Sequence, residues 1–175
     1  MMYQLVNMVK TREAVLHMQR VLQILSGKQK IQLTTVESIG DIKWVLSRGT
    51  YNFVYVVAHH VKDEGIMLGS SFVPFGDVAA MLSMYHVPKT IFFNSCFGDQ
   101  RRVWDSEMKK GVEEVVTSSA FLEMPVMFQY AEYIFQTRDK WTTAHAAKAA
   151  KKLFPEAAVV YVKAGGFVPN TRPER

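Results

Sequence analysis

Two apolar runs that each end at a chemically reactive side chain constrain this sequence most. The first, Tyr51–His60, reads YNFVYVVAHH, and the second, Thr90–Asp99, reads TIFFNSCFGD. Both have the length and the aromatic and β-branched content of strands buried on both faces, which are typical of parallel sheets. If a helix crosses between them, the strands lie side by side, and His59 and Cys96 share one carboxyl edge. A thiol and an imidazole at that edge are the minimum parts of a cysteine nucleophile and its base.

Helical and strand-like patterns alternate along the rest of the chain. Ser38 is a predicted helix cap, and so is either Thr142 or Thr143. This alternation predicts an α/β fold with a mainly parallel sheet and right-handed crossovers. The predicted helices cover residues 11–25, 38–49, 75–84, 100–110, 125–137 and 144–153, and the further strands cover 30–36, 65–68, 112–119 and 157–162.

Length and composition indicate one globular domain over residues 1–166, followed by a flexible basic tail over 167–175. The chain has 175 residues, of which 49% are apolar, and a single cysteine, so an internal disulfide and a cysteine-rich zinc site are both excluded. That cysteine usage fits a reducing compartment. The first residues lack the basic region of a signal peptide, and no apolar run approaches the ~20 residues of a membrane span. We therefore predict a cytoplasmic protein.

The net charge of +5 comes from scattered lysines and arginines without interleaved aromatic residues, so nucleic acid is an unlikely partner. No cofactor is predicted, because no glycine-rich loop opens a helix to cradle a phosphate. No metal site is predicted either, since the histidines have no further ligands at a recognisable spacing. His17 and His145 lie within predicted helices and His86 lies at the end of one, so we interpret all three as structural. A lone buried cysteine is often inert packing, and its pairing with His59 is what favours a reactive role.

The two runs and their surroundings resemble the clan CD cysteine peptidases, which include caspases, metacaspases, gingipain and separase. The stronger resemblance is to the CHAT branch, a caspase-like domain often fused to tetratricopeptide repeats. Phe53–His59 is similar to the CHAT histidine strand, and Thr90–Cys96 is similar to its cysteine strand. The resemblance extends over nearly the whole chain, in the family's order, through Arg12–Val15, Val115–Pro125, Thr142–Ala150 and Ala158–Gly165.

The resemblance implies a caspase-like three-layer sandwich, with a mainly parallel central sheet flanked by helices, that hydrolyses peptide bonds in polypeptides. By position, Cys96 attacks the peptide carbonyl as a thiolate and His59 protonates the leaving amine. The backbone N–H groups of Cys96 and His60 are expected to bind the oxyanion, and an acyl-enzyme then hydrolyses. CHAT-like peptidases are commonly controlled by attached domains, which implies a separate regulatory protein or another role for this chain.

Two residues depart from the family pattern. His60 stands where the family has glycine, and we expect its side chain to crowd the substrate and weaken the oxyanion site. Asn94 stands where metacaspases have an aspartate that receives a basic substrate side chain, which argues against a strong preference for lysine or arginine. Asp99 lies close enough in sequence to contribute to substrate binding. Ser118 and Ser119, at the end of the next predicted strand, are expected to help wall a substrate groove.

Three functions fit these observations. The first is a cysteine endopeptidase with a Cys96–His59 dyad. The second is a pseudopeptidase of the same fold that acts as a partner-binding or regulatory module, which the residue at position 60 favours. The third is a doubly wound ligand-binding or signalling domain in which the cysteine and histidine meet by coincidence.

Overall fold

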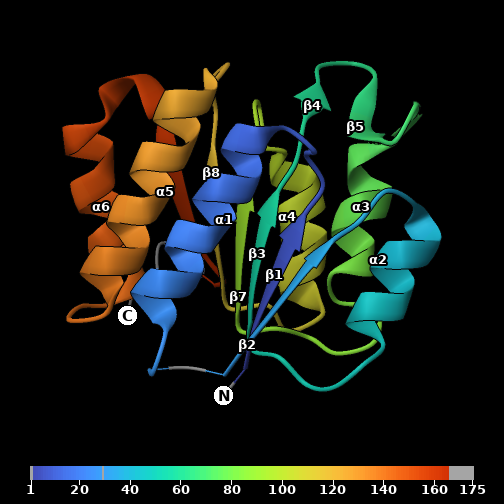
Figure 1. Ribbon diagram of the computed structural model, residues 1–175, viewed down its shortest axis with the longest axis horizontal. Helices are drawn as coiled ribbons and strands as arrows, with labels where there is room; N and C mark the ends of the chain where they lie inside the picture. The colour runs from blue at the N-terminus through green and yellow to red at the C-terminus, as the bar shows by residue number, and fades with distance from the viewer. Residues whose placement is uncertain (1, 29, 166–175) are drawn as a thin grey trace, which may run out of the picture.

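A six-stranded sheet forms the centre of this computed structural model, which describes residues 2–28 and 30–165 (Figure 1). The strand order is β2-β1-β3-β7-β8-β9, and all neighbours are parallel except the antiparallel pair β8 and β9. The mainly parallel sheet predicted from the sequence is confirmed. Its strands are β1 (Met2–Asn7), β2 (Lys30–Thr35), β3 (Phe53–Val57), β7 (Thr90–Asn94), β8 (Glu114–Ser118) and β9 (Val159–Lys163).

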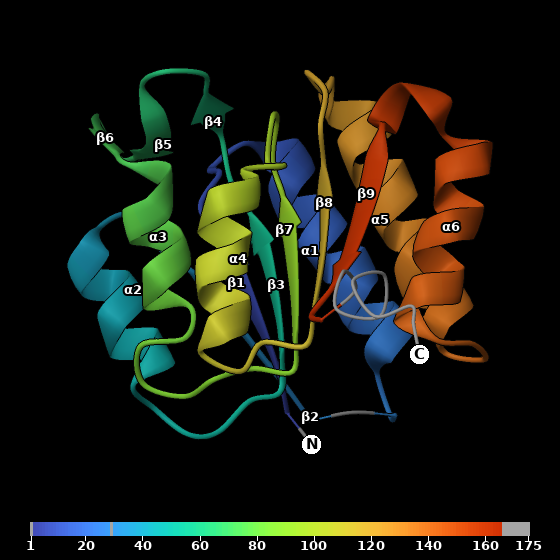
Figure 2. The same ribbon diagram turned by 180° about the vertical axis from the view of Figure 1, so that it is seen from behind.

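Helices cover both faces of this sheet, as Figures 1 and 2 show from opposite sides. One face carries α1 (Arg12–Leu25), α5 (Met124–Arg138) and α6 (Thr143–Leu153), and a 3-10 turn (Pro155–Ala157) follows α6. The other face carries α2 (Ile39–Leu46), α3 (Phe75–Met81) and α4 (Arg101–Lys109). The predicted three-layer arrangement is therefore confirmed.

Side-chain capping begins three of the helices. Thr11 accepts a hydrogen bond from the backbone N–H of Ala14 at 3.2 Å, and Ser38 caps α2 as predicted, at 3.1 Å from Asp41 N. Thr142, one of the two predicted candidates, caps α6 at 3.1 Å from His145 N. Each bond satisfies one of the N–H groups that a helix start leaves without an intrahelical partner.

The first strand is the main difference from the predicted elements. The sequence of β1, MYQLVN, carries polar residues at Gln4 and Asn7 and shows no clear strand period, yet it lies between β2 and β3. Both polar side chains are buried, and each makes one hydrogen bond: Gln4 Nε2 donates to Gln32 O on β2 at 3.4 Å, and Asn7 Oδ1 accepts from Val9 N at 3.0 Å. Tertiary contacts on both sides thus override a weak local pattern.

Side chains of β3 alternate between two apolar cores. Phe53, Tyr55 and Val57 pack in the core under α1, α5 and α6, and Val54 and Val56 pack in the core on the opposite face. All five residues are buried, which explains why the run reads as continuously apolar.

A small antiparallel sheet follows β3 at the carboxyl edge of the central sheet. It consists of β4 (His60–Val61), β5 (Gly65–Leu68) and β6 (Ser71–Val73), of which β5 matches the predicted extended piece at 65–68. Gly65 adopts φ +118°, and a Cβ there would overlap the Val73 carbonyl, so this hairpin requires glycine. The predicted basic tail at 167–175 lies outside the described residues.

Candidate active site

His59 and Cys96 follow neighbouring parallel strands at the carboxyl edge of the central sheet. In the β3–β7 register Val57 is paired with Asn94, and the Ala58 amide still donates to Asn94 O at 3.1 Å. His59 and Cys96 each lie two residues beyond this last pair of the register. Cys96 packs in the core under α1 and α5, the face that Val57 also occupies. If strand alternation continues past Val57, residue 59 is directed to that same face.

Accessibility distinguishes the two residues. His59 is exposed and lines a cavity at the sheet edge, whereas Cys96 is only 7% exposed. The segment after β8 covers the thiol: Leu122 N donates to Sγ at 3.2 Å, and Sγ lies 3.5 Å from Leu122 O. The neighbouring Phe121 is 67% exposed, so this covering segment has one well-packed and one solvent-facing apolar side chain.

The turn after Cys96 is held by close contacts. Phe97 adopts φ +50°, an uncommon left-handed conformation for a residue with a side chain, and its N–H donates to Ala120 O at 3.0 Å. Trp104 Nε1 donates to Gly98 O at 2.7 Å. A Cβ at position 98 would overlap the Thr117 hydroxyl, so only glycine fits there. These contacts fix the backbone that leaves the cysteine.

The His60 side chain turns away from the thiol. It is 6% exposed, its ring lies 4.8 Å from that of Phe75, and its Nδ1 is 2.8 Å from Cys96 O. A carbonyl can only accept, so Nδ1 carries the hydrogen of this bond. In this structure the imidazole packs beside Phe75 and hydrogen-bonds to the Cys96 carbonyl, and the expectation that residue 60 crowds a substrate stays a prediction.

Pairing in the small antiparallel sheet sets the direction of the His60 backbone N–H relative to β5. Met67 N donates to His59 O at 2.9 Å, and His60 is paired with Ile66 in the β4–β5 ladder. In an antiparallel ladder, the residue between two hydrogen-bonded pairs directs its N–H away from the partner strand. The His60 amide accordingly points away from β5.

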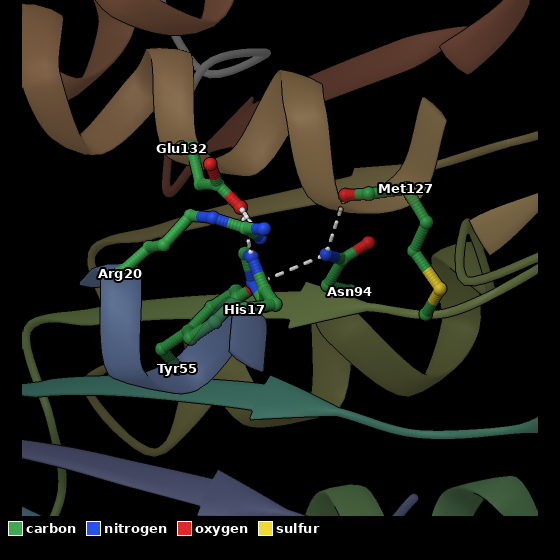
Figure 3. Close-up of polar contacts among 6 residues, drawn as sticks. All are labelled: His17, Arg20, Tyr55, Asn94, Met127 and Glu132. Atoms are coloured by element: carbon green, nitrogen blue, oxygen red, sulfur yellow. Dashed lines mark hydrogen bonds and ion pairs between the residues drawn. The ribbon is translucent and has the colours of Figure 1, made fainter. Parts of the chain in front are cut away.

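Asn94, two residues before the cysteine, belongs to a buried hydrogen-bond network beneath the edge (Figure 3). Its Nδ2 donates to Tyr55 OH at 2.8 Å and to Met127 O at 2.9 Å, and its Oδ1 accepts from Tyr130 OH at 2.8 Å. The side chain is fully buried. Its polar atoms are thus all engaged in tying β7 to β3 and α5, and its contribution to the site in this structure is indirect.

The network continues to the protein surface through α1. Tyr55 OH lies 2.6 Å from Nε2 of the buried His17, and His17 Nδ1 lies 2.7 Å from Glu132 Oε2 (Figure 3). Since a carboxylate only accepts, Nδ1 donates to Glu132 and Nε2 accepts from the tyrosine. Arg20 NH1 lies 3.5 Å from the same carboxylate.

Burial dominates the electrostatics of this network. It lowers the pKa of His17, against the opposing effect of the hydrogen bond to Glu132. Burial also raises the pKa of Tyr55 and Tyr130, and the nearby Cys96 contributes to the second shift. All three groups are therefore held in their neutral forms, as the directions of the hydrogen bonds require.

The remaining residues predicted to bind substrate differ in accessibility. Ser118 is fully buried and donates to Ala157 O at 2.6 Å, whereas Ser119 is exposed. The Asp99 side chain is 26% exposed, and its Oδ1 lies 3.6 Å from Arg101 NH2. Ser119 is thus accessible, whereas Asp99 is only partly exposed and its Oδ1 atom is buried. Within residues 2–28 and 30–165 no group of three or more potential metal ligands occurs, and no helix there is long and apolar enough to cross a membrane.

Comparison with known proteins finds a similar fold by structure alone. No protein-family profile matches the sequence, and no curated protein matches it. The structure is similar to that of a secreted C11 cysteine protease from Bacteroides thetaiotaomicron in complex with an irreversible peptide inhibitor, with a TM-score of 0.67 and 9% sequence identity. The similarity covers 94% of this chain and 66% of the protease chain. The caspase-like fold predicted from the sequence is therefore supported, whereas the identity is too low to extend to activity.

Proposed function

We propose that this chain is a caspase-like cysteine peptidase in which Cys96 is the nucleophile and His59 is the general acid. The observation that carries the proposal is the β3–β7 pairing: His59 and Cys96 each follow, by two residues, the last pair of its register, Val57 and Asn94. The order of the sequence motifs further favours the CHAT branch within this fold. The peptide inhibitor bound to the C11 protease makes a polypeptide the favoured substrate class.

In the proposed reaction, Cys96 Sγ attacks the carbonyl carbon of a peptide bond. The developing oxyanion accepts hydrogen bonds from the Cys96 and His60 N–H groups, while His59 protonates the leaving amine. Water then hydrolyses the thioester and releases the second product. Substrate must displace the Leu122 contact to reach the sulfur, because the thiol is covered in this structure.

The burial of Cys96 favours a second candidate, a binding module of the same fold that cuts nothing. Incubation with a peptidyl acyloxymethyl ketone, followed by mass spectrometry of the intact protein, separates the two. A peptidase gains one adduct at Cys96, His59→Ala slows the labelling at least 10-fold, and His86→Ala, a histidine outside the site, does not. If the native protein binds peptides reversibly but forms no adduct and releases no products, the peptidase proposal fails.

A further inference from the structure

A cavity of about 530 Å³ opens at the carboxyl edge beside His59. Its wall is formed by the ends of β1 and β2, the β5 hairpin and the start of α5. The lining is mostly apolar and includes three methionines and two valines: Met8, Met67, Met124, Val9 and Val36. Flexible methionines adapt to apolar groups of different shapes, so this lining suits a side chain rather than one rigid ligand.

Two observations show that this cavity lies next to the proposed catalytic residues. His59 itself forms part of the wall. The segment that contacts the nucleophile also reaches the cavity, because Leu122 N donates to Cys96 Sγ at 3.2 Å and Met124, two residues later, lines it. A peptide whose carbonyl sits at Cys96 therefore has one neighbouring side chain within reach of the cavity.

The charges at the cavity argue against an ionic side chain. No carboxylate is among the residues that line it within the described part of the chain, so a lysine or arginine would find no counter-ion. Lys10 is the cation at the rim, and it forms an ion pair with Glu37. Because that pair is largely exposed, it offers an acidic side chain little net attraction.

We propose that this cavity binds a large apolar side chain, such as methionine, leucine or phenylalanine, next to the scissile bond of the substrate. This inference rests on the proposed peptidase function. Burial of such a side chain favours it over a charged one by about 10- to 100-fold in rate, from the transfer free energy of an apolar side chain.

The test compares peptidyl acyloxymethyl ketones that differ only in the residue next to the reactive group: Met, Leu, Phe, Lys or Asp. We expect the three apolar probes to label Cys96 at least 10-fold faster than the two charged probes. Met67→Glu should shift the preference toward Lys. Met84→Glu, an equivalent change at a side chain that is 53% exposed and outside the cavity lining, should leave it unchanged.

Met67→Trp serves as a second variant, because filling the cavity should slow the Phe probe more than the Lys probe without adding a charge. A flat profile, or a Lys or Asp preference in the native protein, overturns the inference and leaves the peptidase proposal standing. Absence of labelling by every probe, with iodoacetamide still able to alkylate unfolded Cys96, overturns the peptidase proposal and the inference with it.

Discussion

Replacing His60 by alanine removes its hydrogen bond to the Cys96 carbonyl, and the structure allows the loss of stability to be worked out. The change deletes the 2.8 Å hydrogen bond from Nδ1 to Cys96 O, and Ser95 Oγ, at 3.4 Å, is left as the nearest side-chain donor to that oxygen. A net loss of about 1 kcal/mol is expected for this bond. Loss of the buried ring against Phe75 adds about 1–2 kcal/mol.

The sum is a free energy of unfolding lowered by about 2–3 kcal/mol. For a domain of 175 residues this corresponds to a midpoint lowered by roughly 4–12 °C. Thermal denaturation followed by circular dichroism measures this shift. Labelling of Cys96 by a peptidyl electrophile at about 20 °C, well below the transition, measures whether Cys96 has moved while the protein is still folded.

His60→Asn provides the matched control, because the asparagine Nδ2 can occupy the position of the imidazole Nδ1 and restore the donor. We expect it to recover part of the stability and most of the labelling rate. The His60→Gly variant distinguishes the hydrogen-bond argument from the expectation that residue 60 crowds the substrate. Crowding requires Cys96 of the glycine variant to be labelled faster than Cys96 of the native protein. Faster labelling of Cys96 in His60→Gly than in the native protein, or unchanged stability of His60→Ala, would refute the role given to this hydrogen bond.

Three other changes test the surroundings of the site. Asn94→Asp should lower the free energy of unfolding by about 2–4 kcal/mol in urea titrations, because a carboxylate cannot donate to the α5 carbonyl; a stable variant with a new preference for basic substrates would contradict this. Gly98→Ala should cost about 3 kcal/mol or more, whereas Gly76→Ala, with only an ordinary 3.7 Å neighbour, should be nearly neutral by the same titration. Because burial lowers the pKa of His17 below its ordinary value of 6.5, the unfolded chain binds the proton first; stability should therefore fall as the pH drops below about 6.5, and less steeply in His17→Gln. Equal slopes in the two proteins would show that His17 does not contribute.

The parts of the structure that could be predicted are those in which local pattern and burial coincide. β3 and β7 are buried on both faces, so their sequences are apolar throughout and their positions in a parallel sheet follow. The placement of His59 and Cys96 at one edge then depends only on strand direction. β1 has no such run, and its central position depends on pairing with β2 and β3.

Side-chain partners far apart in the chain could not be predicted. His17 fits a helical core position, but its bond to Glu132 spans 115 residues and depends on how α1 packs against α5. The hydrogen bond from His60 to Cys96 O depends on the path of the chain from β3 into β4. Strand alternation assigns a side chain to a face; it does not say which atom it will meet there.

Contacts on both faces of the sheet hold the backbone around Cys96 but leave its sulfur covered. Asn94 ties β7 to α5 on one face, and His60 binds the Cys96 carbonyl from the other. The sulfur instead contacts Leu122, which is 5% exposed, next to Phe121, which is 67% exposed. Since the backbone is fixed from both sides, access to the thiol must come from movement of the segment around residues 119–123. In the proposed peptidase, Cys96 reacts only once Leu122 is displaced, and an apolar substrate side chain that enters the neighbouring cavity beside Met124 is well placed to displace it.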